Sequence, residues 1–294
     1  MLPSVHLKYA LTSKQAIRLS YFKSISRPGF GDLAPIQDNS NEQFTYLGNP
    51  HLKHVRADNL DLRYELFPGL ADQILVGAFY KHLQNPIEYY VTNLNGPSSI
   101  YIMPQNTNEA TNYGAEAVFT KFFGVFGVSA NYTYTHSRVT TTKRLSTFVQ
   151  GTGITQLNVS QTRPLQGQAN HVGNVSLLYK DPRLGLDVQL AFAYTGDRID
   201  QVSPYYGLDI WQKPFTQLDL SLEKRITRHF VLFGKVNNLT NSPNKEYIKF
   251  PYTAVNKGLP SGYTVPFQDA GSNYYVVQKD IYKLSLLGGI RYKF

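Results

Sequence analysis

The chain has 294 residues, of which 42% are hydrophobic, 14% aromatic and only 17% charged. This aromatic content supplies enough apolar surface to offset the entropy of ordering, which excludes an intrinsically disordered chain. No run approaches about 20 apolar residues, so membrane-spanning helices are excluded as well. Because the chain has no Cys, it holds no disulfide, no thiolate metal site and no cysteine nucleophile.

The formal net charge of +9 raises the question of a nucleic-acid partner. Basic residues are scattered singly or in pairs such as Lys143-Arg144, without a run or a known nucleic-acid module. We therefore expect no nucleic-acid binding. The first eight residues also lack the basic and apolar regions of a signal peptide.

Hydrophobic side chains alternate with polar or small ones along most of the chain, a period of two that is typical of strands with two different faces. The clearest run has Leu186, Val188, Leu190, Phe192 and Tyr194 on one face. Taken in chain order, such runs predict about eleven strands, near 4–11, 15–26, 54–67, 73–92, 110–123, 125–142, 168–180, 185–203, 215–226, 230–248 and 279–294.

The connections between these strands alternate between short turns and long loops. Short turns are expected at 11–14, 68–72, 123–124, 181–185 and 227–229, and long loops at 27–53, 93–109, 143–167, 204–214 and 249–278. In an up-and-down meander this alternation places all turns at one end and all loops at the other, as in transmembrane barrels. The sequence therefore predicts an all-β fold, a transmembrane antiparallel up-and-down β-barrel.

A soluble antiparallel β-sandwich also alternates and remains the alternative fold. The polar face argues for a watery lumen, because it carries charged residues such as Arg18, Arg63 and Glu116, which we expect to pair across strands or with another domain. Eleven strands cannot close antiparallel, since the first and last run in the same direction. We therefore expect the chain to be only part of a barrel.

Several segments resemble TonB-dependent outer-membrane receptors, in the family's order along nearly the whole chain. The similar segments are the strand and "RP" loop at 17–35, the "GNP" segment with its following strand at 48–65, 77–87, 112–116, 163–168, 236–241, and the aromatic-ended last strand at 289–294.

The resemblance implies a 22-stranded barrel with an N-terminal plug and a TonB-binding box. Here residues 1–294 would be a partial barrel domain, the C-terminal half, lacking the other half and the plug through which TonB acts. It implies an outer-membrane location in a Gram-negative bacterium, contact with lipid, and uptake of a bulky, scarce solute such as a siderophore, oligosaccharide or peptide. Tyr292 and Phe294 would present the last strand to the barrel-assembly machinery. A passive porin-like barrel remains the alternative function.

We find no catalytic or cofactor-binding motif in the sequence, and expect neither an enzyme nor a cofactor. His51 and His54 lie three apart in a predicted loop, where surface histidines are more common than metal ligands. Solute binding is expected in the long loops, where Trp211, Tyr205 and Tyr206 accompany Arg198, although such aromatics also form interface girdles. Two further candidates precede prolines at loop bases, where the proline also directs the loop's exit: Arg27 and Arg163.

Overall fold

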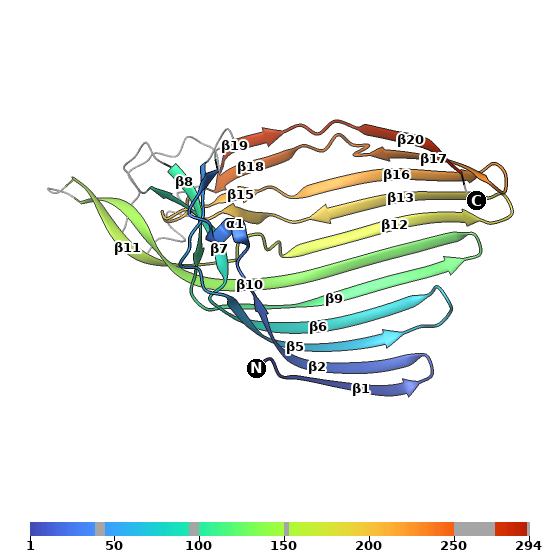
Figure 1. The fold of residues 1–294 in the computed structure, drawn as a ribbon, viewed down its shortest axis with the longest axis horizontal. Helices are drawn as coiled ribbons and strands as arrows, with labels where there is room; N and C mark the ends of the chain where they lie inside the picture. Colours follow the sequence, from blue (N-terminus) through green and yellow to red (C-terminus); the bar gives the residue numbers. More distant parts are fainter. Residues whose placement is uncertain (39–44, 94–99, 150–152, 250–273, 293–294) are drawn as a thin grey trace.

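The computed structural model describes residues 1–38, 45–93, 100–149, 153–249 and 274–292, and a large antiparallel sheet dominates it (Figure 1). Eleven strands of this sheet follow each other in chain order, and β11 (Gly153–Arg163) pairs with one of them off this path. The eleven are β1 (Ser4–Thr12), β2 (Gln15–Ser26), β5 (Val55–Leu66), β6 (Gln73–Gln84), β9 (Ala110–Phe123), β10 (Phe126–Val149), β12 (His171–Asp181), β13 (Leu186–Thr195), β16 (Phe215–Arg225), β17 (Phe230–Asn237) and β20 (Ser285–Tyr292). The predicted up-and-down order is therefore confirmed.

The strand register places the alternating apolar side chains on one continuous face. Leu62 lies opposite Leu19 on one neighbouring strand and Ala78 on the other, and Leu190 lies opposite Leu177 and Leu220. Leu62 is 50% exposed and Leu177 is 53% exposed. In a sandwich these rows would be covered by a second sheet. Their exposure favours the membrane-barrel interpretation, in which lipid covers them.

The opposite face of the same sheet is polar and carries ion pairs between strands. Arg18 Nε lies 2.7 Å from Glu65 Oε1, and Arg63 Nη2 lies 2.6 Å from Glu116 Oε1. The predicted cross-strand pairing of Arg18, Arg63 and Glu116 is thus confirmed. One face of the sheet is therefore apolar and the other polar, as the alternation predicts.

Short turns gather at one end of the sheet and the long connections at the other (Figure 1). Two of the turns contain glycines in the left-handed region, Gly124 with a φ of 64° and Gly185 with a φ of 60°. A side chain is strained in that region, which is why glycine occupies these tight connections.

Three predicted strands prove too long, because the chain leaves the main sheet within each. The run 73–92 divides into β6 and β7 (Ile87–Asn93), 185–203 into β13 and β14 (Arg198–Gln201), and 230–248 into β17 and β18 (Asn244–Lys249). Asn85 interrupts the first and Asn238 the third, with φ angles of 55° and 53°. A residue in this left-handed conformation cannot continue a strand. The run 279–294 likewise overreaches, since β20 begins at Ser285.

The segments predicted as long loops form ordered structure of their own. One four-stranded sheet follows the order β14, β15 (Ile210–Gln212), β18, β19 (Tyr274–Asp280). Another follows the order β3 (Gln37–Asp38), β4 (Thr45–Leu47), β8 (Ile100–Asn106), β7, and is accompanied by the short helix α1 (Phe30–Leu33). We call these two sheets, α1 and the β10–β11 hairpin from Val139 to Arg163 the loop layer. In the described part of the chain no helix is both long and apolar enough to cross a membrane.

Candidate functional site in the loop layer

Two of the predicted binding residues lie on neighbouring strands of the loop layer. Arg198 of β14 lies opposite Gln212 of β15, and Ile199 lies opposite Trp211. Because successive residues of a strand point to opposite faces, Arg198 and Trp211 are on different faces of this sheet. The structure therefore places both residues in one sheet, but their side chains do not point toward each other.

Trp211 stacks on a cation supplied by the protein itself. Lys249 Nζ lies 3.7 Å from the centre of the Trp211 ring and 2.6 Å from Asp197 Oδ2. A cation over an indole face is attracted by the ring's quadrupole. This contact fixes the indole within the loop layer.

Tyr205 and Tyr206 follow β14 and connect to the β10–β11 hairpin through the backbone. The amide of Arg144 donates to Pro204 O at 2.8 Å, and the amide of Tyr206 donates to Arg144 O at 2.9 Å. Both tyrosine side chains are half-buried. These bonds attach the predicted aromatic loop to the longest strand of the main sheet.

The other predicted residues lie elsewhere in the chain. Arg27 is exposed where β2 ends. On the last strand, Tyr292 is 50% exposed, and its ring centre lies 5.2 Å from that of Phe230. Phe294 lies outside the described residues.

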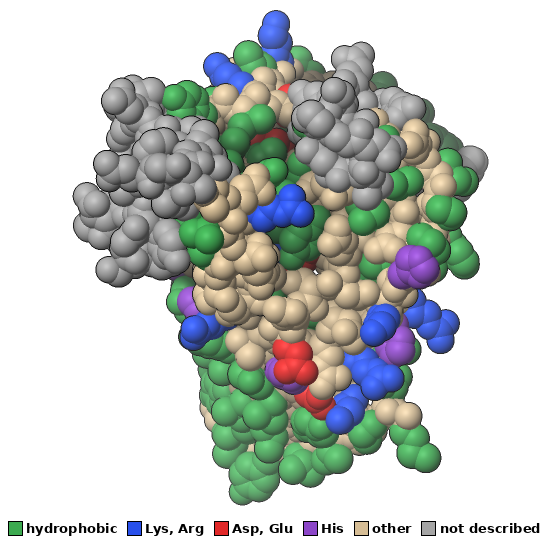
Figure 2. Space-filling model, turned by 90° about the vertical axis from the view of Figure 1, so that its left-hand side faces the viewer, with side chains coloured by type: hydrophobic (Ala, Val, Ile, Leu, Met, Phe, Trp, Pro, Cys, Tyr) green, Lys and Arg blue, Asp and Glu red, His purple; other side chains and the backbone are tan. Residues whose placement is uncertain are grey.

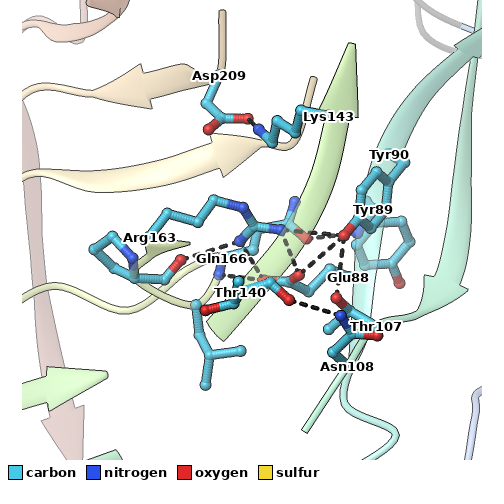
Figure 3. A network of polar contacts seen from close by, with 12 residues as sticks. Glu88, Tyr89, Tyr90, Thr107, Asn108, Thr140, Lys143, Arg163, Gln166 and Asp209 are labelled. Atoms are coloured by element: carbon cyan, nitrogen blue, oxygen red, sulfur yellow. Dashed lines mark hydrogen bonds and ion pairs between the residues drawn. The ribbon is translucent and has the colours of Figure 1, made fainter. Parts of the chain in front are cut away.

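Arg163, the last predicted binding residue, lies in a buried ion pair at the centre of Figure 3. Its Nη1 and Nη2 donate to the two carboxylate oxygens of Glu88 at 2.9 and 2.7 Å, and each side chain is 2% exposed. Nη2 also donates to the Tyr90 hydroxyl at 3.1 Å. Two parallel bonds between guanidinium and carboxylate give a strong and geometrically specific contact. It joins the end of β11 to the start of β7.

A second buried pair, between Lys143 of β10 and Asp209, is drawn beside the Arg163–Glu88 contacts in Figure 3. Asp209 also accepts a bond from the Ser203 amide at 2.8 Å. Burial lowers the pKa of Lys143 below its usual range, although the Asp209 carboxylate favours the charged form. This pair ties the hairpin to the segment that contains Tyr205 and Tyr206.

Backbone contacts complete the connection between the two four-stranded sheets. The amide of Val202 donates to Tyr89 O at 3.1 Å, and the amide of Val91 donates to Val202 O at 2.9 Å. Gln166 adds a side-chain link, because its Oε1 accepts from the Tyr89 amide and its Nε2 donates to Asp200 O. The long connections thus form one hydrogen-bonded unit.

A cavity of about 580 Å³ opens within this unit, between α1, β4, β7 and β14. Its carboxylates are Asp32, Asp38 and Asp200. Burial raises the pKa of the lining Tyr89 to about 12, and the Asp32 carboxylate, which accepts from the Tyr89 hydroxyl at 2.7 Å, adds to the shift. This volume is typical of a small-molecule site.

The loop end, seen face-on in Figure 2, has polar and charged side chains over its middle and hydrophobic ones along its lower border. Among the described residues, no three His, Cys, Asp or Glu side chains come close enough together to hold a metal ion.

Sequence reasoning missed Glu88, Lys143, Asp209 and the cavity. These residues come from different long connections, and no local pattern links Glu88 to a partner 75 positions away. The one available signal was the single charge of Glu88 inside an otherwise apolar and aromatic run, since such charges are buried only when they are paired.

The structure resembles solved siderophore receptors and a solved copper transporter. A ferric enterobactin receptor mutant (PfeA) from Pseudomonas aeruginosa, in complex with enterobactin, is 16% identical with a TM-score of 0.54, over 82% of this chain and 35% of that one. The siderophore receptor PirA from Acinetobacter baumannii is 16% identical with a TM-score of 0.54, over 82% of this chain and 37% of that one. The copper transporter OprC is 13% identical with a TM-score of 0.57, over 83% of this chain and 34% of that one. These identities show a shared fold alone, and the chain spans about a third of the length of these proteins.

No curated protein matches the chain by sequence. The family model "TonB dependent receptor-like, beta-barrel" matches residues 1–239, most of the chain and ten strands of the meander. The matched part includes both buried ion pairs and the residues that line the cavity. The chain therefore belongs to the TonB-dependent receptor β-barrel family.

Proposed function

We propose that the chain is the C-terminal barrel portion of an outer-membrane receptor that imports a bulky, scarce solute with energy transmitted by TonB. One observation carries the proposal: eleven strands share an exposed apolar face and an ion-paired polar face, with every long connection at one end. That arrangement matches a lipid-facing wall around a polar lumen. The family is one of outer-membrane receptors, not enzymes, which supports the same function.

The solute class we propose is a siderophore, an oligosaccharide or a peptide, recognised at the loop layer. Two similar solved structures are described as siderophore receptors and one as a copper transporter. Arg27, Arg198, Tyr205, Tyr206 and Trp211 are our candidates for contacts with the solute. Contact with the remaining candidate, Arg163, requires its pair with Glu88 to open.

The partners follow from the same proposal. Residues 1–294 would form part of a barrel domain whose apolar face contacts outer-membrane lipid, in a Gram-negative cell. The remaining barrel strands and a plug would complete the receptor, and TonB would act through the plug. Tyr292 and Phe294, at the end of the last strand, would be recognised by the barrel-assembly machinery.

Uptake by cells tests this function. We expect deletion of the encoding gene to abolish growth on one solute of a panel of ferric siderophores, oligosaccharides and peptides. Deletion of tonB should have the same effect, and re-expression of the gene should restore growth. Growth that persists without TonB, together with steady ion conductance of the purified protein in planar bilayers, would instead identify the passive porin.

Fractionation tests the location separately. The full gene product should enter the outer-membrane fraction, require detergent for extraction and migrate differently in gels before and after heating. A protein that stays in buffer without detergent would be the soluble sandwich, and the transport proposal would fail with it.

A further inference from the structure

The cavity of the loop layer is lined by acidic and neutral groups only. Three carboxylates, Asp32, Asp38 and Asp200, border it, and no Lys, Arg or His does so among the described residues. The chain as a whole is basic, with a net charge of +9. A wall of one negative sign in such a chain creates a local potential that attracts positive charge.

Asp200 is the carboxylate best placed to receive a ligand. Its main-chain oxygen accepts from Gln166, but within the described chain no donor bonds its side-chain oxygens. Burial raises the pKa of Asp200, and the positive charge of Arg198 opposes this shift without forming an ion pair. A half-buried carboxylate without a hydrogen-bond donor gains free energy from any donor that enters the cavity.

Gln201 supplies an independent sign of a missing partner. This residue lines the cavity and is 8% exposed, and its buried Oε1 has no hydrogen-bond partner. Buried polar atoms of proteins are almost always bonded, so an orphan acceptor beside a cavity points to a donor that the cavity receives. Because carboxylates and an amide oxygen all accept hydrogen bonds, they favour a ligand that carries several N–H groups.

The shape of the site favours an organic cation over a metal ion. The described carboxylates are too far apart for three of them to share one ion. Tyr46 and Tyr89 border the same cavity and add aromatic residues to its wall. Ammonium and guanidinium groups use both features, since they donate several hydrogen bonds and are attracted to aromatic rings.

We propose that this cavity binds an ammonium or guanidinium group of the imported solute, with Asp200 as its main charge partner and Gln201 as an additional acceptor. The inference rests on the proposed transport function for the role of the bound group. It narrows the solute class to compounds that carry a cationic group.

Binding to the full receptor, purified in detergent, tests the site. The probes are butylguanidinium and butylammonium, with butanol as the neutral control, and calorimetry reports binding. We expect both cations to bind and butanol not to bind. Asp200→Asn should weaken cation binding about tenfold or more, because a bond to a charged acceptor is lost. The affinities of butylguanidinium and butylammonium, compared with each other, show which of the two groups the cavity prefers.

Asp187→Asn is the matched control, since it removes the same charge from an exposed position of β13. It should leave cation binding unchanged. Gln201→Leu, of similar size, should weaken binding without changing the charge. Heat-modifiable migration confirms that each variant is folded. Equal affinity for butanol and the cations, or equal loss in Asp187→Asn and Asp200→Asn, would overturn the proposal.

The result separates the two proposals. Asp200-dependent probe binding in a protein that supports no TonB-dependent uptake retains the cation site and refutes transport. TonB-dependent uptake by a protein that binds none of the cations refutes the cation site and retains transport.

Discussion

The Arg163–Glu88 pair is one of two deeply buried ion pairs of the described loop layer, with both side chains 2% exposed. Glu88 also accepts a bond from the Gln166 amide at 2.7 Å. A buried pair is costly to desolvate, so its main contribution is to fix one arrangement of the elements that carry it. Here those elements are β7 and the end of β11.

Breaking this pair from one side tests that role. Glu88→Gln leaves the Arg163 charge buried without a counterion, and we expect the free energy of unfolding of the loop layer to fall by about 3–5 kcal/mol. Trp211, the only Trp of residues 1–294, reports this unfolding by its fluorescence during a urea titration. The double variant Glu88→Leu with Arg163→Met should recover most of the loss. Equal losses in the single and double variants would contradict the explanation by an unpaired charge.

Glu246 makes the stability of its sheet depend on pH. Burial raises its pKa to about 7 from an ordinary 4.5, and the Asp200 and Asp280 carboxylates add to the shift. The folded state therefore binds a proton more tightly than the unfolded state. This stabilisation is complete below about pH 4.5 and is lost as the pH rises towards 7.

We expect faster amide hydrogen exchange in β18 at pH 8 than at pH 5, after correction for the intrinsic rates. Glu246→Gln should remove most of the difference, because the amide does not titrate. A variant that keeps the full pH dependence would assign it to another group.

The breaks between the main sheet and the loop layer are properties of single elements. Asn238, which ends β17, has a φ of 53° and is 6% exposed. Its side-chain amide donates to Tyr282 O at 2.7 Å, and its Oδ1 accepts from the Ser242 amide at 2.8 Å. One residue thus turns the chain out of the sheet and bonds the segments on both sides.

Two substitutions separate these contributions. Asn238→Ala introduces left-handed strain and loses the side-chain bonds, so we expect a loss of about 2–4 kcal/mol in the free energy of unfolding. Asn238→Gly loses the bonds but tolerates the backbone angle, and should cost less. Urea unfolding in detergent gives both values. If glycine costs as much as alanine, the backbone angle contributes nothing.

The main strands were predictable because their signal is local. Alternation places Leu186 and its successors on one face whatever the rest of the chain does, and the strands 15–26 and 110–123 were placed to the residue. The breaks that separate β7, β14 and β18 from the main strands were missed, and two of them fall at Asn85 and Asn238, which are compatible with a strand until their φ angles are known. The cavity was missed because its walls come from several connections that only the folded chain brings together.

For the whole molecule, the two faces of the sheet make opposite predictions for the same substitution. Leu177 of β12 lies on the exposed apolar face, and its neighbour Ser176 lies on the polar face. In a membrane, Leu177→Arg should cost about 2–4 kcal/mol near the middle of the bilayer. Ser176→Arg should be nearly neutral because its face borders water.

Refolding into lipid vesicles followed by urea unfolding measures both variants, and gel migration before and after heating shows how much of each inserts. Equal costs for Leu177→Arg and Ser176→Arg would contradict a lipid-facing wall, since only a wall between lipid and water distinguishes the two positions.

The bonds between the long connections limit how this part of the barrel can be re-engineered. The contacts of Val202 with Tyr89 and Val91, and of Arg144 with Pro204 and Tyr206, use main-chain atoms and do not depend on side-chain identity. Point substitutions on the exposed side chains of the loop layer should therefore be tolerated in large numbers, as in the binding loops of antibodies. Transplanting one connection from a relative would remove its neighbours' partners, so specificity should be exchangeable only as a complete set.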